Sequence, residues 1–227
     1  MSKYLVEVKN LKKVFDHKNG KIKIFHDVNL GIKPGELVAL VGPSGSGKSS
    51  FLHLLSLLDK PTAGKIYFLG KDSKNFSENR KDEIRRRNIS LIFQDNNLLS
   101  DFTTIENVLM PLIIRGESYK SSHNKAKNIL RRVNLLERRN HFPSELSGGE
   151  QQRVAIARSI IAETDLILAD EPTGNLDFKT SQDIFSYFLK LKKLKKAVIF
   201  ATHNRELAKK ADYKLSIYNG NIKRVNA

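Results

Sequence analysis

Apolar and polar residues alternate along two stretches near the N-terminus, residues 3–11 (KYLVEVKNL) and 22–32 (IKIFHDVNLGI). Alternation with a period of two places successive side chains on opposite faces of an extended chain. A Lys-Pro-Gly sequence at 33–35 then marks a turn before the next apolar run. The pattern predicts strands, which we expect to form an antiparallel β subdomain at the N-terminal end.

Later stretches are continuously apolar and short, and they occupy residues 36–42, 89–94, 165–172 and 196–203. Runs of this kind are typical of strands buried on both faces, as in a parallel sheet. Between and around these apolar runs, apolar residues recur at the spacing of a helix. The expected helices cover residues 48–58, 104–114, 124–136, 149–162 and 181–194.

Thr104 and Ser147 are the expected N-caps of two of these helices. Because strands and helices alternate, the fold class is expected to be α/β with a mostly parallel sheet. The helices between the second and third apolar runs predict an inserted α-helical lobe. We therefore expect one domain, 1–227, in which 1–94 and 161–227 form the core and 95–160 the lobe.

Composition and charge restrict the possible locations and partners of the protein. The 227 residues contain no cysteine, which excludes disulfides and thiolate metal sites, and no apolar run approaches the ~18 residues of a membrane span. No signal peptide is expected, since the N-terminus alternates apolar and charged residues. The net charge of +16 allows an anionic partner or a solvated basic surface. The basic residues are scattered and Trp is absent, so no nucleic-acid partner is expected.

Residues 42–50 (GPSGSGKSS) contain the pattern G-x-x-x-x-G-K-S between an expected buried strand and an expected helix. In such a loop, backbone N–H groups and the helix N-terminus bind phosphate, and the lysine adds a mobile positive charge. A serine hydroxyl after the lysine is a small oxygen ligand for Mg²⁺. The pattern predicts a P-loop NTPase core. Its predicted nucleotide-binding residues are Gly42, Pro43, Ser44, Gly45, Ser46, Gly47, Lys48, Ser49 and Ser50.

Two adjacent carboxylates, Asp170 and Glu171, end the apolar run LILADEP. Placing them there is unfavourable unless they face a cation or accept hydrogen bonds. Alone, the pair is also compatible with helix capping. In a P-loop fold, Asp170 would contact the Mg²⁺ shell with Ser49, and Glu171 would polarise the attacking water.

The segment 144–160 (SELSGGEQQRVAIARSI) begins like a second phosphate loop but has no lysine after its glycines. The predicted residues of this second anion site are Ser147, Gly148 and Gly149, and Glu150 follows them. At a helix start, the serine and the N–H groups can bind an anion or merely cap the helix. Together with the motifs above, LSGGEQQRVAIAR resembles the signature segment of ATP-binding-cassette (ABC) ATPases. The resemblance implies that the signature of one copy closes over ATP held by another, in a head-to-tail dimer.

The resemblance covers essentially the whole chain and implies further roles. Gln94 matches the glutamine that contacts Mg²⁺ and the attacking water, and His203 matches a catalytic histidine that contacts the γ-phosphate. Asp177, in the loop GNLD (174–177), matches the carboxylate that reaches across the dimer. Phe15 most nearly fits the aromatic residue that stacks on adenine, although tyrosine is commoner there and Phe15 is also a candidate core residue.

Three stretches resemble the lipoprotein-releasing and macrolide-exporter branch of the family, and they lie at 51–72, 94–114 and 168–177. FPSELSGGE and LLSDFTTIENV look most like the ATPase of a lipoprotein-releasing complex. The resemblance implies an ATP-hydrolysing subunit on the cytoplasmic side of the inner membrane that works with integral membrane permease subunits. A macrolide or peptide exporter and a cell-division complex of the same branch are alternatives. A plain P-loop kinase would not explain LSGGE.

Overall fold

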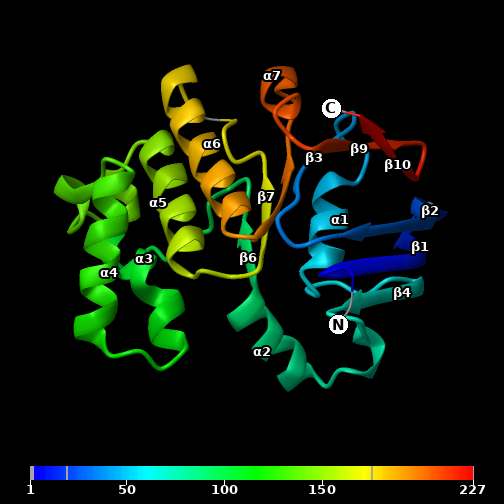
Figure 1. Cartoon of the computed structure of the whole chain (residues 1–227), viewed down its shortest axis with the longest axis horizontal. Helices are drawn as coiled ribbons and strands as arrows, with labels where there is room; N and C mark the ends of the chain where they lie inside the picture. Colours follow the sequence, from blue (N-terminus) through cyan, green and yellow to red (C-terminus); the bar gives the residue numbers. More distant parts are fainter. Residues whose placement is uncertain (1–2, 19, 175, 227) are drawn as a thin grey trace.

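The computed structural model describes residues 3–18, 20–174 and 176–226. Two β-sheets and a group of helices lie side by side, with the helical group at one end and the antiparallel strands at the other (Figure 1). The antiparallel sheet has the order β2-β1-β4-β5. Its strands are β1 (Val6–His17), β2 (Gly20–Ile32), β4 (Ala63–Phe68) and β5 (Lys71–Asp72).

The second sheet has the order β10-β9-β3-β8-β7-β6. Its strands are β3 (Leu37–Val41), β6 (Ile89–Ile92), β7 (Leu166–Asp170), β8 (Ala197–Ala201), β9 (Tyr213–Tyr218) and β10 (Asn221–Asn226). All neighbours in it run parallel except β9 and β10. This topology confirms the predicted α/β class. Because parallel strands end at one edge, the segments that follow β3, β7 and β8 meet there.

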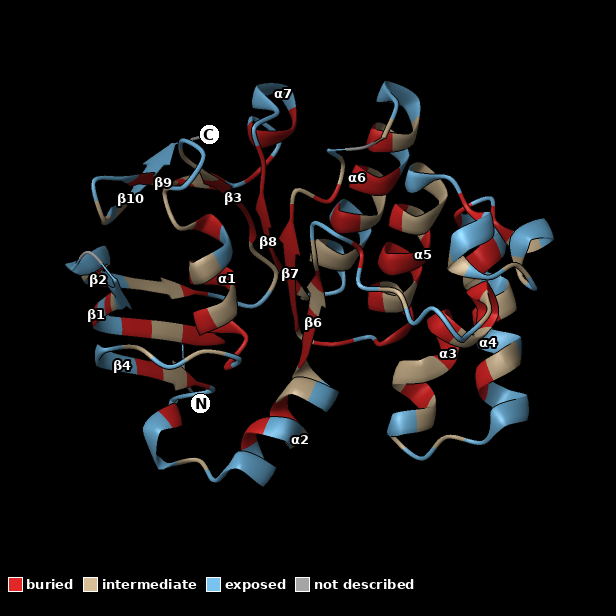
Figure 2. Cartoon of the chain, turned by 180° about the vertical axis from the view of Figure 1, so that it is seen from behind, coloured by how far each residue is buried: buried red, intermediate tan, exposed pale blue. Residues whose placement is uncertain are grey.

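The parallel strands are buried along both faces, as Figure 2 shows for β7 and β8. In β3, Val38 and Leu40 belong to an apolar cluster shared with the antiparallel sheet, whereas Leu37 and Ala39 belong to a second cluster on the opposite face. A continuous apolar run is therefore needed, because every side chain of the strand faces a packed layer.

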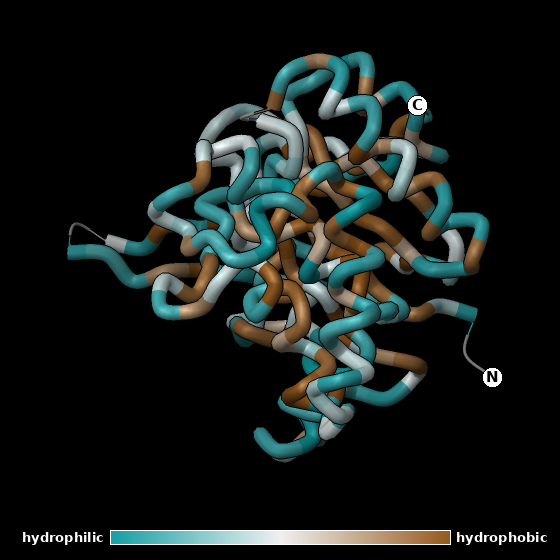
Figure 3. Tube along the Cα trace, turned by 90° about the vertical axis from the view of Figure 1, so that its left-hand side faces the viewer, coloured by the Kyte–Doolittle hydropathy of each residue, from teal (hydrophilic) through white to brown (hydrophobic). Residues whose placement is uncertain are grey.

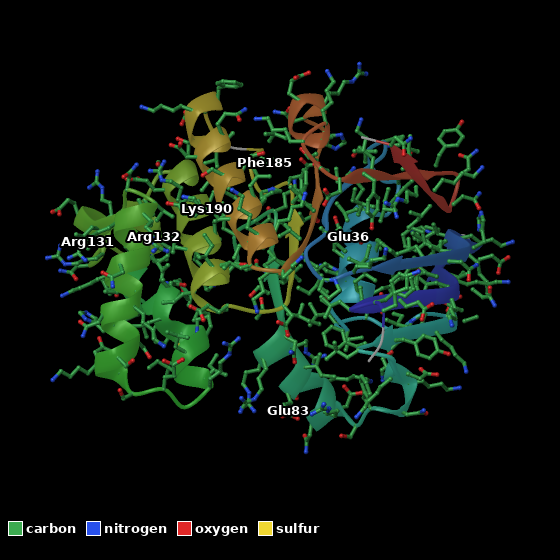
Figure 4. The ribbon with its side chains drawn as sticks, viewed as in Figure 1. Glu36, Glu83, Arg131, Arg132, Phe185 and Lys190 are labelled. Carbon is green, nitrogen blue, oxygen red and sulfur yellow. The ribbon has the colours of Figure 1, made fainter. Side chains whose placement is uncertain are left out.

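Helix α1 (Lys48–Leu55) packs in the first cluster, on the side of the antiparallel sheet. Helices α6 (Phe178–Lys193) and α7 (Arg205–Ala208) contribute to the second. Phe185, labelled in Figure 4, lies between α6 and the sheet, with its ring centroid 5.5 Å from that of Phe200 in an edge-to-face arrangement. Such aromatic pairs stabilise the contact beyond the area that they bury.

The helical group consists of α3 (Thr104–Ile114), α4 (Tyr119–Arg132) and α5 (Gly148–Ile161). These helices share a third apolar cluster. Helix α5 takes part in two clusters, because Val154 and Ala157 face α3 and α4 while Ile156 faces the sheet. In the trace, apolar residues concentrate in the interior and the periphery is mostly hydrophilic (Figure 3). The division at 94/95 and 160/161 stays a prediction.

The structure differs from two expectations. Helix α2 (Glu78–Asn88) was not predicted, since its sequence ENRKDEIRRRN is almost entirely polar and only Lys81 and Ile84 are buried. The N-cap of α3 is Thr103 rather than Thr104, because Glu106 Oε2 accepts hydrogen bonds from the Thr103 N–H (2.8 Å) and Oγ1–H (2.6 Å). Ser147 caps α5 as expected.

Across the described ranges, the structure contains no helix that combines the length and the apolar character needed to cross a bilayer. Short 3-10 turns connect the longer elements. They cover Ser73–Asn75, Leu136–Arg138 and Pro143–Glu145.

Candidate nucleotide-binding site

A pocket of about 310 Å³ opens where the parallel strands end. It brings together the phosphate-loop residues, the glutamine after β6, the carboxylates at the end of β7 and the histidine after β8, which are far apart in sequence. Its lining residues are Ile24, Ser44, Gly45, Gly47, Lys48, Ser49, Ser50, Gln94, Asp170, Glu171 and His203. The sequence reasoning predicted all of them except Ile24.

The phosphate loop needs glycine where backbone segments approach closely. Gly47 is the N-cap of α1 and has a left-handed φ of 96°, and a Cβ there would lie 2.5 Å from Ile24 Cγ2. At Gly42, a Cβ would lie 2.7 Å from Ser46 Oγ. A side chain at either position would require neighbouring atoms to shift, so glycine at both positions preserves the shape of the loop.

Lys48 is buried and folds back over its own loop. Its Nζ donates hydrogen bonds to the carbonyl oxygens of Gly42 (3.1 Å) and Pro43 (3.2 Å), and it lies 3.3 Å from His203 Nε2. Neutral carbonyl groups orient the ammonium without neutralising it. The positive charge of Lys48 is therefore directed into the pocket beside the N-terminus of α1, where an anion would be stabilised.

Glu171 follows β7 with a left-handed φ of 47°. Its Oε1 lies 3.2 Å from His203 Nε2, and its Oε2 accepts a hydrogen bond from the His203 N–H (3.4 Å). Burial raises the pKa of the Glu171 carboxyl above its usual value, although His203 and Lys48 oppose the shift. A carboxylate with a raised pKa is a stronger base and therefore a better proton acceptor.

Three oxygen-bearing side chains meet in the pocket: Ser49, Gln94 and Asp170. Asp170 is 8% exposed. Mg²⁺ prefers hydroxyl, amide and carboxylate oxygens and is usually held by one or two carboxylates together with phosphate and water. Within the described residues no group of three or more His, Cys, Asp or Glu side chains could hold a metal ion by itself. One carboxylate together with a hydroxyl and an amide oxygen fits a Mg²⁺ ion that takes its remaining ligands from a bound phosphate and water.

Among the predicted signature residues, Ser147, Gly148, Gly149 and Glu150, none lines this pocket. They begin α5 in the helical group, away from α1 (Figure 1). Glu150 Oε2 accepts hydrogen bonds from the Ser147 N–H (2.8 Å) and from the Ser147 hydroxyl Oγ–H (2.9 Å), so the two residues form a capping box. The structure thus does not bring the second anion site to the first within one copy.

Phe15 and Asp177 also lie outside the pocket lining. Phe15 is 41% exposed, which rules out the core alternative, and Lys13 Nζ lies 4.5 Å from its ring centroid. Asp177 caps α6, where its Oδ1 accepts a hydrogen bond from the Thr180 N–H (2.9 Å). Asn175, within the predicted dimer loop, lies outside the described residues. Adenine stacking and dimer contact stay predictions for these two side chains.

Sequence reasoning assigned no site role to two residues near the pocket. Ile24 lies on β2, and the alternation that predicted this strand gives no sign that the strand reaches the phosphate loop. Asn204 follows His203, and its Oδ1 accepts hydrogen bonds from the N–H groups of Glu206 (3.0 Å) and Leu207 (3.1 Å). It therefore fixes the start of α7 directly after the histidine, and an N-cap signal before RELA would have identified it.

The family model described as "ABC transporter" matches residues 25–174. The chain therefore belongs to the ABC transporter family. The predicted family is confirmed, and with it the prediction of an ATPase that couples ATP hydrolysis to transport. The matched range contains the phosphate loop, Gln94, the signature segment and the two carboxylates at the end of β7.

Relatives within the ABC family extend over nearly the whole chain. A protein of Rickettsia bellii named "Lipoprotein-releasing system ATP-binding protein LolD" is 46% identical, over 95% of this chain and 96% of its own length. A protein of the same name from Wigglesworthia glossinidia brevipalpis is 45% identical, over 98% of this chain and 97% of its own length.

The fold is likewise that of solved ABC cassettes. A structure titled "Dimeric structure of a post-hydrolysis state of the ATP-binding cassette MJ0796 bound to ADP and Pi" aligns with a TM-score of 0.93 and 36% identity. It covers 97% of this chain and 98% of that chain. A second structure, also described as a dimer of MJ0796, aligns equally well.

Proposed function

We propose that this chain binds Mg²⁺–ATP in the pocket at the end of the parallel strands and hydrolyses it to power lipoprotein release from the inner membrane. The observation that carries the proposal is the convergence of Lys48, Ser49, Gln94, Asp170 and Glu171 on one pocket. The names of the relatives and their near-complete coverage of the chain support lipoprotein release as the process that ATP hydrolysis powers.

The residues of the chain divide the chemistry among them. The loop N–H groups and Lys48 Nζ bind the β- and γ-phosphates, for which Lys48 gives up its contacts with the carbonyls of Gly42 and Pro43. Ser49, Gln94 and Asp170 would hold Mg²⁺, which supplies charge neutralisation on the phosphate oxygens. Glu171 accepts a proton from the attacking water. His203 fixes the Glu171 carboxylate and reaches the γ-phosphate.

The site is completed by a second copy of the chain. The N-terminus of α5 carries Ser147 and the glycine N–H groups but is remote from the pocket of its own copy. A head-to-tail dimer would place this helix end against the γ-phosphate bound by the other copy, with Asp177 at the contact. In this arrangement, 95–160 acts as a lobe that carries the signature residues. The dimeric cassettes of MJ0796 support this arrangement.

In this proposal an integral membrane subunit supplies the passage for the lipoprotein. A groove of about 360 Å³ runs between α2, β6, α3 and α5. Its walls combine apolar and basic side chains, among them Leu91, Pro111, Ile114, Arg86 and Arg158. We place a cytoplasmic helix of the membrane subunit in this groove, near the segment after Gln94. The chain would then be peripheral on the cytoplasmic side of the inner membrane.

Co-expression with the candidate membrane subunits tests the proposal. The complex should co-purify and, in proteoliposomes, release a lipoprotein to an acceptor protein only when Mg²⁺–ATP is present. Ile114→Asp in the groove should disrupt co-purification, whereas Leu194→Asp should not, although Leu194 is the more exposed of the two (69% against 56%). Transport of a macrolide in place of lipoprotein release would assign the chain to the exporter alternative.

A further inference from the structure

The signature helix α5 carries an acidic side chain at the end that, in the proposed dimer, meets ATP. Glu150 lies in the first turn of α5, and its Oε2 accepts both the N–H and the Oγ–H of Ser147. These are donors that a phosphate would use. The carboxylate therefore occupies, within its own copy, the position of an anionic ligand at this helix end.

The other oxygen of the same carboxylate is paired with a cation. Arg138 Nε donates a hydrogen bond to Glu150 Oε1 over 3.1 Å, and the Glu150 side chain is only 18% exposed while that of Arg138 is 50% exposed. Hydrogen bonds from Ser147, followed by the charge of Arg138, hold the pKa of Glu150 below its usual value despite partial burial. Glu150 is thus a fixed negative charge beside the helix end.

Arg138 is held in place by its backbone neighbours. It ends the 3-10 turn Leu136–Arg138, and the residues that follow it accept hydrogen bonds from the start of α3. Arg139 O accepts from the Ile105 N–H (2.9 Å), and His141 O accepts from the Thr104 N–H (2.8 Å). The Arg138 Nη1 atom also lies 3.2 Å from His141 Nε2. The guanidinium is therefore anchored to the same helical group that carries the signature.

We propose that Arg138 is a positioning residue that neutralises Glu150, so that the N-terminus of α5 can accept the γ-phosphate bound by a second copy. If Arg138 did not pair with Oε1, the Glu150 carboxylate would repel the phosphate, and its partial burial would weaken the screening of that repulsion by water. With Arg138 in place, the pair is close to neutral and the helix N-terminus supplies the remaining attraction. The inference rests on the proposed dimeric function and adds a residue outside both phosphate-binding segments.

A double-mutant cycle on the full-length chain tests the inference. Dimer formation at saturating Mg²⁺–ATP is measured by analytical ultracentrifugation in a Glu171→Gln background, which prevents turnover. ATP binding to single copies is measured in parallel with a fluorescent ATP analogue at low protein concentration. Arg131→Gln is the charge-matched control, since Arg131 lies at the outer edge of the helical group (Figure 4) and pairs only with the neutral Asn128 among the described residues.

Arg138→Gln should weaken the dimer about 3- to 10-fold at low salt, the range of a partly exposed charge at a helix end. It should leave ATP binding to single copies unchanged, because Arg138 does not line the pocket. Arg131→Gln should have no effect, and Arg138→Lys should retain most of the affinity. In a Glu150→Gln background, Arg138→Gln should change the dimer affinity by less than about twofold, since no acidic charge is left to neutralise.

Two results would overturn the inference while leaving the proposed function intact. One is an Arg138→Gln dimer as stable as its parent. The other is an equal loss in the Glu150→Gln background, which would mean that Arg138 acts directly or through the fold. A parent chain that forms no dimer with Mg²⁺–ATP would overturn the proposed function, and this inference with it.

Discussion

His203 lies against both carboxylate oxygens of Glu171: its backbone N–H donates to Oε2 over 3.4 Å, and its ring Nε2 lies 3.2 Å from Oε1. The two residues follow adjacent parallel strands, β7 and β8, and the N–H of Glu171 donates to the carbonyl of Ala201. The carboxylate that we assign as the proton acceptor is therefore oriented by the sheet itself.

Glu171→Gln should reduce ATP turnover by about 10²–10⁴-fold, the usual contribution of a general base, because an amide cannot accept the proton of the attacking water. ATP binding and the ATP-dependent dimer should persist, since Lys48 and the loop N–H groups are untouched. Phosphate release and gel filtration with ATP measure the two properties. Glu163→Gln, an exposed change outside the pocket, should turn over normally. Undiminished turnover by Glu171→Gln would remove Glu171 from its assigned role.

Gly148→Asp should fold normally and yet be inactive. Beyond its chain neighbours and the backbone of its own helix, no atom of the described residues lies within 4 Å of a Cβ built at Gly148. An aspartate in the first helical turn is also compatible with the helix dipole. Facing the phosphate of a second copy, the new charge should lower turnover by at least about 100-fold, since juxtaposed like charges cost several kcal/mol.

Thermal unfolding and ATPase assays separate the two effects of Gly148→Asp. Gly148→Ala, which adds volume without charge, is the matched control and should keep most of the activity. An active Gly148→Asp chain would contradict the proposal that a second copy completes the site.

Phe15→Ala should raise the KM for ATP about tenfold, the loss expected when one base–aromatic stacking contact is removed. Because Phe15 is 41% exposed, the free energy of unfolding should change little. Phe15→Tyr should behave like the parent chain. An unchanged KM in Phe15→Ala would contradict the predicted stacking on adenine.

Glu106→Gln should lower the free energy of unfolding by about 0.5 kcal/mol at neutral pH, because the neutral amide lacks the favourable interaction of a carboxylate with the helix N-terminus. Hydrogen bonds from the Thr103 hydroxyl and N–H lower the pKa of Glu106 in the folded chain. Its stabilising contribution is therefore present above the ordinary carboxyl pKa and is lost as the pH falls through the lowered value.

The difference between parent and Glu106→Gln should accordingly shrink as acid is added below pH ~4.5. Urea denaturation at several pH values measures it. Thr104→Val serves as a comparison for the cap assignment, because Thr104 Oγ1 bonds to His141 O and does not cap α3. A difference that grows in acid would contradict the assigned cap.

Strand positions could be predicted from sequence because burial on both faces of a parallel sheet leaves a continuous apolar run, as in β3, β7 and β8. Helix α2 could not be predicted, because its charged side chains form ion pairs mainly with one another, such as Arg80–Glu83 and Lys81–Glu78. Such a helix needs almost no apolar face and so carries no periodic signal.

The phosphate-loop residues were predictable because the loop has a fixed spacing, and Asp170 and Glu171 because they end an apolar strand of such a core. The roles of Gln94 and His203 came from the family resemblance alone, since neither residue carries a motif by itself. The contribution of Ile24 was not predictable, because it depends on how β2 packs across the loop rather than on its own pattern. The pairing of Arg138 with Glu150 was equally invisible, since it joins a 3-10 turn to a helix twelve positions later.

Helix α5 has one apolar side against the sheet, through Ile156, and another against α3 and α4, through Val154 and Ala157. A shortened chain that lacked α3 and α4 would expose an apolar surface on α5 and would aggregate. Fragments intended for binding studies or crystallisation should therefore retain both helices, even when only the phosphate loop is of interest.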